Sequence, residues 1–167
     1  MQSFMTISHL LGLRQVKAIS DYQFGKDITD LLFSDLENIR LQRSLATNKI
    51  RYIYHNDDLL LTLRPKNGFF TLSLFSAQKI INTVGIPHLR VIVLNEISEF
   101  IMKGRNVFCK HVVDIDENLR PLDEVIVVNQ KDELLGIGKL KLPVSYVKSF
   151  KRGIAVNIRK GVYKSKI

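Results

Sequence analysis

The chain has 167 residues, 46% of them hydrophobic and including nine Phe and five Tyr, which is enough to build a packed core and excludes a disordered chain. Its formal net charge of +9 indicates a polyanionic partner such as RNA, DNA or an acidic membrane surface, although a basic balance also simply favours solubility. The chain has one cysteine, so no disulfide within the chain and no zinc site built on several thiolates is expected. No apolar run approaches the ~20 residues of a membrane span, and the first residues lack the basic region of a signal peptide. These features indicate a cytoplasmic protein.

The first half is predicted to begin with helices and then to change to strands. An amphipathic helix is expected near residues 4–19, and a short helix capped by Asp27 follows it, while the polar residues 34–48 are expected to be irregular. From residue 49 the hydrophobic period becomes two, and "NDD" and "KNG" are turn sequences, so a three-stranded antiparallel meander is predicted. Its strands are residues 49–54, 59–65 and 69–74, and a helix over 76–85 follows.

The second half is predicted to be a small β-barrel, because short strands and turn signals alternate at close spacing. The fold class is therefore α+β, with an N-terminal amphipathic helix (1–20), a small α/β domain that contains the meander (21–86) and a β-barrel domain (87–167). The expected strands of the barrel are 90–94, 106–115, 124–129, 134–142 and 153–163, and the expected helices are 96–103 and 144–150.

Positive charge concentrates toward the C-terminus. Residues 89–167 carry fifteen Lys/Arg against nine Asp/Glu, and no acid follows Glu133. From Lys139 onward there are nine cations. A uniformly mixed surface does not produce this pattern, whereas a basic face built by the C-terminal elements does.

Two stretches are candidates for contact with a phosphate backbone. In "KGRNVFCK", Gly104 permits a left-handed turn at a helix exit, flanking cations supply charge, and exposed backbone N–H groups could meet phosphate oxygens. In "FKRGIAVNIRKG", two Lys/Arg pairs precede glycines, and Ala155, Asn157 and Arg159 alternate with apolar residues, so they are expected to face outward from a half-buried strand. This strand and the loop 103–110 are expected to build one groove. The candidate RNA-binding residues are Lys103, Gly104, Arg105, Asn106, Phe108, Lys110, Lys151, Arg152, Gly153, Asn157, Arg159 and Lys160.

Each stretch also has a plain structural interpretation. "KGRN" by itself is typical of a glycine helix stop with solvated flanks, and the terminal strand could be a solvated cationic edge. Phe108 is expected to pack in the barrel, with stacking on an unpaired base as the alternative. "DYQFG" (21–25) is expected to pack within its own domain rather than against another subunit. The four histidines have no metal-ligand spacing, so no metal, cofactor or acid–base chemistry is predicted.

The order of these motifs resembles that of a known family. A strand, a short helix, "KGRNVF", a hairpin of "DEVIVVN" and "LLGIGKLKL", and then "FKRGIAVNIR" resemble a PUA domain, a small RNA-binding pseudo-barrel. "DYQFG", "RYIYHNDDLLLTLRPKNGFFTLS" and "SAQKI" resemble the segment that precedes the PUA domain in archaeal tRNA-guanine transglycosylase, the enzyme of archaeosine biosynthesis. The resemblance covers residues 21–160, and together with the basic tail it favours RNA contact at "KGRNVF" over a plain helix stop.

The resemblance implies a chain that binds tRNA and does not catalyse. The catalytic barrel of that family carries two essential aspartates and a cysteine-rich zinc site, which a single cysteine does not supply. The expected protein is the tRNA-binding subunit of a split transglycosylase, with the tRNA acceptor end and a catalytic chain as its partners in a hetero-oligomer. It would position tRNA for base exchange in the D-arm. Two alternatives stay open: the tRNA-binding subunit of a split archaeosine synthase, and a freestanding PUA protein that acts on rRNA.

Overall fold

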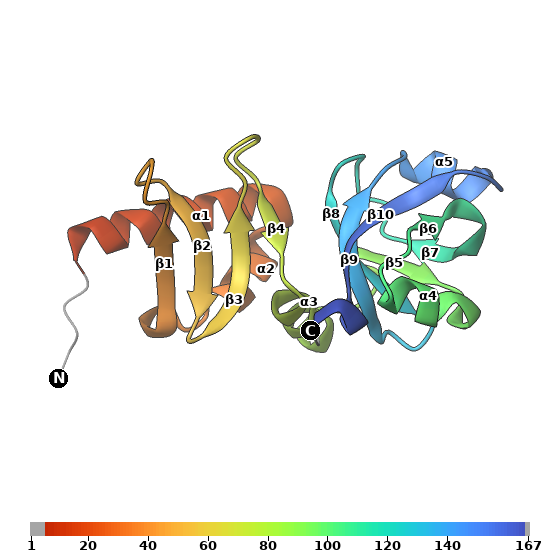
Figure 1. Cartoon of the computed structure of the whole chain (residues 1–167), viewed down its shortest axis with the longest axis horizontal. Coiled ribbons are helices and arrows are strands. Elements are labelled where there is room, and N and C mark those ends of the chain that lie inside the picture. Colours follow the sequence, from red (N-terminus) through yellow and green to blue (C-terminus); the bar gives the residue numbers. More distant parts are fainter. Residues whose placement is uncertain (1–5, 166–167) are drawn as a thin grey trace. The chain divides into compact units, whose positions relative to one another are not determined.

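The computed structural model describes residues 6–165, and the chain divides into two compact units, Met1–Ile80 and Ile81–Ile167 (Figure 1). The predicted start of the first helix, at residues 4 and 5, lies outside the described residues. Within the described range no helix combines the length and the hydrophobicity that a membrane span needs. The α+β fold class is confirmed, and each unit has its own sheet.

The first unit is one antiparallel sheet with helices on one side. Thr6 caps the first helix, since its hydroxyl accepts from the His9 backbone N at 3.3 Å. The sheet has four strands in the order β1-β2-β3-β4, and Figure 1 shows α1 and α2 behind it. The elements are α1 (Ile7–Phe24), α2 (Lys26–Leu32), the 3-10 turn η1 (Leu36–Asn38), β1 (Ile39–Arg43), β2 (Ile50–His55), β3 (Asp58–Leu63), β4 (Phe70–Leu72) and α3 (Leu74–Thr83).

The prediction of three strands was wrong by one, because residues 34–48 contain β1. This strand lies at the edge of the sheet and pairs only with β2, through a turn in which the Ser44 N–H donates to the Lys49 carbonyl at 2.8 Å. Only Ile39 and Leu41 alternate as apolar residues in β1, and its other positions are Arg and Gln. In so short an edge strand, the alternation of apolar and polar residues is too weak to distinguish a strand from a loop.

Residues 21–25 pack within their own unit, as expected. The side-chain amide of Gln23 donates to the Phe70 carbonyl at 2.8 Å and accepts from the Phe70 N–H at 2.7 Å, so it pairs with β4 as a neighbouring strand would. Phe24 is buried, whereas Tyr22 is 82% exposed and stacks on the exposed ring of Phe69. The exposed Tyr22 is the part of this motif that the core does not use.

The second unit is a six-stranded sheet that curls into a nearly closed PUA-like barrel. Its strand order is β6-β10-β9-β8-β5-β7, antiparallel throughout except for the parallel pair β5 and β8. The strands are β5 (Arg90–Val93), β6 (Val107–Phe108), β7 (Val112–Ile115), β8 (Glu124–Asn129), β9 (Leu134–Leu140) and β10 (Ile154–Gly161), and the helices are α4 (Ser98–Met102) and α5 (Val144–Ser149). The 3-10 turns are η2 (Asn95–Ile97), η3 (Cys109–His111) and η4 (Val162–Ser165).

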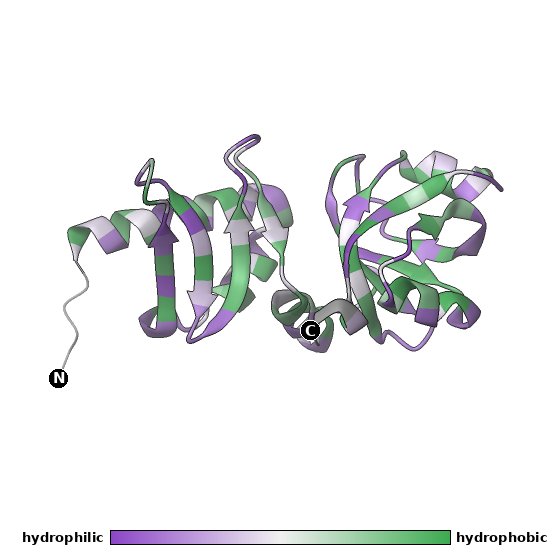
Figure 2. Ribbon diagram, viewed as in Figure 1, coloured by the Kyte–Doolittle hydropathy of each residue, from purple (hydrophilic) through white to green (hydrophobic). Residues whose placement is uncertain are grey.

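The predicted strand 106–115 is broken in two. The turn η3 separates β6 from β7, and these two strands form the opposite edges of the curled sheet. A stretch rich in residues that favour strands does not reveal that the chain leaves one edge of the sheet and rejoins the other. Figure 2 shows the alternation of hydrophobic and hydrophilic bands along the strands of both units, as expected for sheets with one face toward a core.

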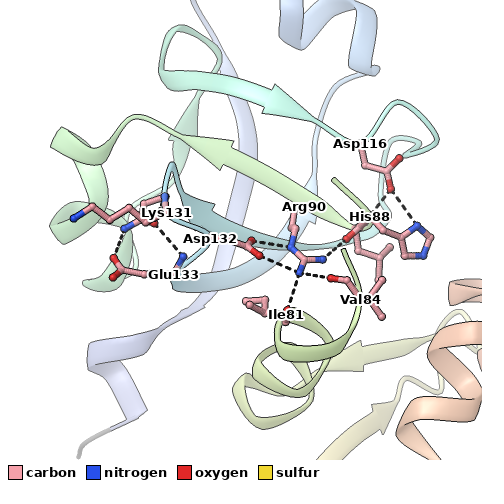
Figure 3. Close-up of polar contacts among 10 residues, drawn as sticks. Ile81, Val84, His88, Arg90, Asp116, Lys131, Asp132 and Glu133 are labelled. Carbon is pink, nitrogen blue, oxygen red and sulfur yellow. Dashed lines mark hydrogen bonds and ion pairs between the residues drawn. The ribbon is translucent and has the colours of Figure 1, made fainter. Parts of the chain in front are cut away.

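Within the second unit, a fully buried arginine holds residues 81–88 against the barrel (Figure 3). The Arg90 guanidinium donates to both carboxylate oxygens of Asp132, at 2.9 and 3.3 Å, and to the carbonyls of Ile81, Val84 and His88 at 3.2, 2.7 and 2.9 Å. Nearby, the buried carboxylate of Asp116 accepts from the Leu89 N–H at 2.8 Å. A buried charge is tolerated only when it is paired and hydrogen-bonded, and these contacts satisfy that requirement for Arg90.

Candidate nucleic-acid interface

The segment between α4 and β6 ends its helix with a complete Schellman motif. Gly104 has a φ of +89°, its N–H donates to the Ile101 carbonyl at 2.8 Å, and the Arg105 N–H donates to the Phe100 carbonyl at 3.0 Å. The expectation that these backbone N–H groups could meet phosphate oxygens was therefore wrong, because both serve the helix end. What the loop offers a ligand is the exposed side chain of Arg105.

Lys103 and Asn106 flank this motif with different roles. The Lys103 ammonium lies 2.5 Å from a carboxylate oxygen of Glu99, and this ion pair is on the surface. The hydrogen bond from Lys103 lowers the pKa of Glu99 below its ordinary value. Asn106 is half-buried, and its side-chain oxygen accepts from the Ile158 N–H at 2.9 Å. Asn106 therefore fastens the loop to β10 and is a structural residue.

The two candidate stretches lie next to each other in space. β6 pairs antiparallel with β10, Phe108 is opposite Ile154, and the Cys109 N–H donates to the Gly153 carbonyl at 3.0 Å. Gly153 has a φ of +100°, which lets the chain turn into β10 directly after Lys151 and Arg152. This pairing brings the exposed cations of both stretches to one edge of the barrel.

Phe108 does not pack in the barrel, so that prediction was wrong. Its side chain is 46% exposed, as Val107 and Cys109 take the inward positions on either side of it. Its cross-strand partner Ile154 is also exposed, whereas Ala155, which was expected to face outward, is buried. The cause is a register shift between Ile154 and Val156, where β10 bulges against the two-residue strand β6.

Arg159 is held by the barrel. Its guanidinium donates to a carboxylate oxygen of Glu124 at 2.7 Å, and the Glu124 side chain is only 1% exposed. Arg159 itself is half-buried, while Asn157 and Lys160 on the same strand are exposed. The structure thus separates Arg159 from the exposed candidates Arg105, Lys110, Lys151 and Arg152 on the neighbouring segments.

Sequence reasoning missed an aromatic pair formed by Tyr146 of α5 and Phe150, which directly follows this helix. The rings of Tyr146 and Phe150 are 5.0 Å apart and inclined by 17°, and both are about half exposed. They are four residues apart, which places them on the same side of a helical turn, directly before Lys151 and Arg152. The i, i+4 aromatic spacing in front of a basic pair is the signal that could have revealed this pair. Helix α5 also contacts η3, which follows Phe108.

We call the exposed side chains along this edge the β6–β10 surface. Its members are Arg105, Phe108, Lys110, Tyr146, Phe150, Lys151, Arg152, Ile154, Asn157 and Lys160. The basic groups suit phosphate oxygens, and the exposed rings suit unpaired bases.

Nothing in the described residues indicates bond-making chemistry. Between residues 6 and 165 no group of three or more His, Cys, Asp or Glu could hold a metal ion. Cys109 is buried, and burial raises the pKa of its thiol above the ordinary value of 9.0, which disfavours the nucleophilic thiolate. Of the histidines, His55 lies against the Asp35 carboxylate at 3.2 Å and stacks on Phe75.

Comparisons with known proteins identify both units. Residues 14–87 match the family described as the patch-forming domain C2 of tRNA-guanine transglycosylase, and residues 89–162 match the PUA domain. The tRNA-guanine(15) transglycosylase of Methanobrevibacter smithii is 40% identical over 152 residues, which are 91% of this chain and 23% of that protein. The enzyme of Thermococcus onnurineus is 37% identical over 157 residues, covering 92% of this chain and 26% of that protein.

The chain therefore spans about a quarter of the length of the curated relatives it matches, and the matched part is their C-terminal region. Solved structures agree on the fold. A hypothetical protein from Pyrococcus horikoshii has a TM-score of 0.74 at 18% identity and covers 98% of each chain. A conserved PUA domain protein from Thermoplasma acidophilum has a TM-score of 0.62 at 18% identity, covering 93% of this chain and 91% of its own.

Proposed function

We propose that this chain, a patch-forming C2 domain followed by a PUA domain, binds tRNA through the β6–β10 surface on behalf of a catalytic tRNA-guanine transglycosylase chain. In this role the chain holds the acceptor end of the tRNA, and the catalytic chain exchanges guanine in the D-arm. The proposal places the protein in the cytoplasm with its tRNA. It assigns no catalytic group to this chain.

The observation that carries the proposal is the pairing of β6 with β10. This pairing brings the exposed side chain of Arg105 to the same edge of the barrel as Lys151 and Arg152. The exposed pair Phe108 and Ile154 lies on the two strands there. Guanidinium groups contact phosphate oxygens bidentately, and exposed aromatic rings stack on unpaired bases. The acceptor end of a tRNA offers both kinds of partner, a phosphate backbone and unpaired nucleotides.

The contribution to the reaction is binding energy and register. Phosphate contacts fix the position of a nucleic acid without reading its sequence. An enzyme that works on a base inside a folded tRNA must first expose that base, and contacts elsewhere on the tRNA offset the cost. A chain that binds the acceptor end therefore raises the activity of a catalytic partner without contacting the reacting base.

Reconstitution tests the proposal directly. The catalytic transglycosylase chain of the same organism is assayed for exchange of labelled guanine into tRNA, with and without this chain. We expect little exchange by the catalytic chain alone and strong exchange with the pair, and an Arg105→Gln/Arg152→Gln variant is expected to restore much less activity. Exchange that does not respond to the added chain contradicts the transglycosylase role. Amidation of the inserted base by an archaeosine synthase, measured on tRNA with and without this chain, then tests the alternative partner.

A further inference from the structure

The sheet of the first unit has one covered face and one open face. A side chain at Gly12 of α1 would meet Leu41 and Ile50, so the inward positions of β1 and β2 face the helix. Ile53 and Leu61 are fully buried on the same side. Figure 1 shows the helices α1 and α2 on that side only. Among residues 6–80, no helix covers the opposite face of β1–β3.

The open sheet face carries two tyrosines and two arginines. Register places Arg40 opposite Tyr54 and Gln42 opposite Tyr52. Arg51 has no partner in β1, because the register shifts there, and its guanidinium lies 5.9 Å from the centroid of the Tyr52 ring. The open sheet face is thus Arg40, Gln42, Arg51, Tyr52 and Tyr54, with Thr62 opposite Tyr52 on β3.

The charge on this face is not balanced by acids. The Arg40 guanidinium lies over the Tyr54 ring at 4.3 Å, and the two tyrosine rings are 6.5 Å apart. In the described part of the chain, the ion pairs of the carboxylates involve other cations, and neither Arg40 nor Arg51 has one. Planar cations beside aromatic rings, without a carboxylate, suit a ligand that is both anionic and flat.

We propose that the open sheet face binds an unpaired stretch of RNA, with bases on Tyr52 and Tyr54 and phosphates on Arg40 and Arg51. A four-stranded sheet with aromatic side chains on its open face is a known way to stack about two or three single-stranded bases. The Gln42 amide adds a donor and an acceptor for a base edge. This site goes beyond the proposed function, which assigns tRNA contact to the barrel.

Two other occupants fit the face less well. A protein partner is disfavoured, because the large apolar side chains that this unit exposes, such as Ile7, Leu11 and Leu45, are not on the open face. Duplex RNA would contact the arginines through phosphates, but its stacked bases offer nothing to the tyrosine rings. The rings are therefore the feature that specifies an unpaired strand.

A tryptophan reporter tests the inference, since the chain contains no Trp. A Tyr52→Trp variant of the full chain is titrated with a short oligouridylate, and we expect saturable quenching of its fluorescence by stacked bases. The matched reporter is Tyr22→Trp, an exposed position on α1, the helix that packs against the opposite face of the sheet. We expect no saturable quenching there. No quenching at position 52, or equal quenching at both positions, overturns the inference.

A second pair of variants separates stacking from folding. Tyr52→Val/Tyr54→Val keeps residues that favour strands, and loss of two stacked bases is expected to weaken oligouridylate binding by about tenfold or more. Tyr52→Phe/Tyr54→Phe keeps the rings and is expected to bind as the unchanged chain does. Equal binding by the Val and Phe variants, with both folded by thermal melting, contradicts the inference.

The two proposals also fail separately. Arg105→Gln/Arg152→Gln is expected to weaken tRNA binding while the Tyr52→Trp signal with oligouridylate persists. If the Arg105→Gln/Arg152→Gln variant binds tRNA with unchanged affinity and the quenching remains, the proposed function fails and the open-face site stands. If the quenching is absent while tRNA binding depends on Arg105 and Arg152, the open-face site fails alone.

Discussion

Arg159 donates to Glu124 at 2.7 Å, and the carboxylate it meets is almost fully buried in the barrel. An arginine predicted to reach RNA therefore helps to neutralise a core charge. We expect Arg159→Gln to lower the free energy of unfolding by about 1–3 kcal/mol, because it leaves a buried carboxylate without its charged donor. Urea unfolding measures this, and Glu124→Gln added to the variant is expected to recover part of the loss. A variant as stable as the unchanged chain, but with weaker RNA binding, contradicts the assignment.

Salt dependence distinguishes the cations that do reach RNA. If Arg105, Lys110, Lys151 and Arg152 each neutralise one phosphate, the slope of log K against log salt is about −3.6, a loss of roughly 150-fold between 50 and 200 mM salt. We expect Arg105→Gln and Arg152→Gln each to reduce the slope by about 1. Fluorescence anisotropy with labelled tRNA at several salt concentrations measures the slope.

The control for this series is Lys131→Gln, which removes an exposed charge from the β8–β9 turn. That turn lies beside the end of β10, as Gly136 pairs with Gly161, whereas Arg152 precedes its start. The control is expected to leave the slope unchanged. A slope near zero for the unchanged chain, or an equal change in all three variants, rules out a specific phosphate surface on the barrel.

The sequence predicted most of the barrel because its strands are marked by strong alternation and by turn residues. Strand β8 was predicted residue for residue, and Gly104 was correctly placed at a helix end. The two basic stretches were also expected to lie together, and the pairing of β6 with β10 brings them side by side. What failed was the direction of individual side chains. The bulge at Ile154 turned Ala155 inward and left Phe108 exposed, and no sequence period encodes such a shift.

The core arginine was invisible from the sequence for a related reason. Arg90 is the first residue of a predicted apolar strand, where a charged side chain is expected to be in solvent. In the structure it is fully buried. Its partners lie on segments far apart in the chain, such as Val84 before it and Asp132 after it. A contact between distant segments depends on the completed topology, so local patterns do not reveal it.

Replacing Arg90 tests its role in holding residues 81–88 against the barrel. Arg90→Met keeps much of the side-chain volume but removes donors to Asp132 and to the carbonyls of Ile81, Val84 and His88. We expect a loss of about 2–5 kcal/mol in the free energy of unfolding. Asp132→Asn is the matched control, because Asn tolerates the left-handed φ of 58° at this position and changes only the charge. The Asn variant is expected to lose less stability than Arg90→Met, and the reverse order contradicts the assignment.

Gly161 controls how closely the last turn of α4 approaches β10. A Cβ at Gly161 would lie 2.6 Å from the Ile101 carbonyl oxygen and would also clash with that of Met102. We expect Gly161→Ala to cost about 1–3 kcal/mol by overpacking, and to weaken tRNA binding as it displaces the helix end that carries Arg105. Gly85→Ala is the control, since a Cβ there meets nothing within 4 Å. Equal melting temperatures for the Gly161→Ala and Gly85→Ala variants contradict this account.

Cys109 is the chain's single thiol, and it reports on opening of the barrel edge at β6. It is buried, and burial raises the pKa of the thiol, so the folded chain holds this proton more tightly than the unfolded chain does. The stability that this group contributes is therefore present below the ordinary thiol pKa of 9.0 and is lost as the pH rises through the raised value. We expect a thiol reagent at pH 8 to modify the native chain far more slowly than the urea-unfolded chain.

The control for Cys109 places a thiol where the surface is open. Ser145 on α5 is exposed, so Ser145→Cys in a Cys109→Ala background is expected to react in the native state at nearly the unfolded rate. If Cys109 in the unchanged chain reacts as fast as this surface thiol, the β6 edge is open in solution. Residues Phe108 and Ile154 would then not form a fixed pair for a base to contact. Slow reaction of Cys109 that slows further when tRNA is bound supports a closed edge that the RNA covers.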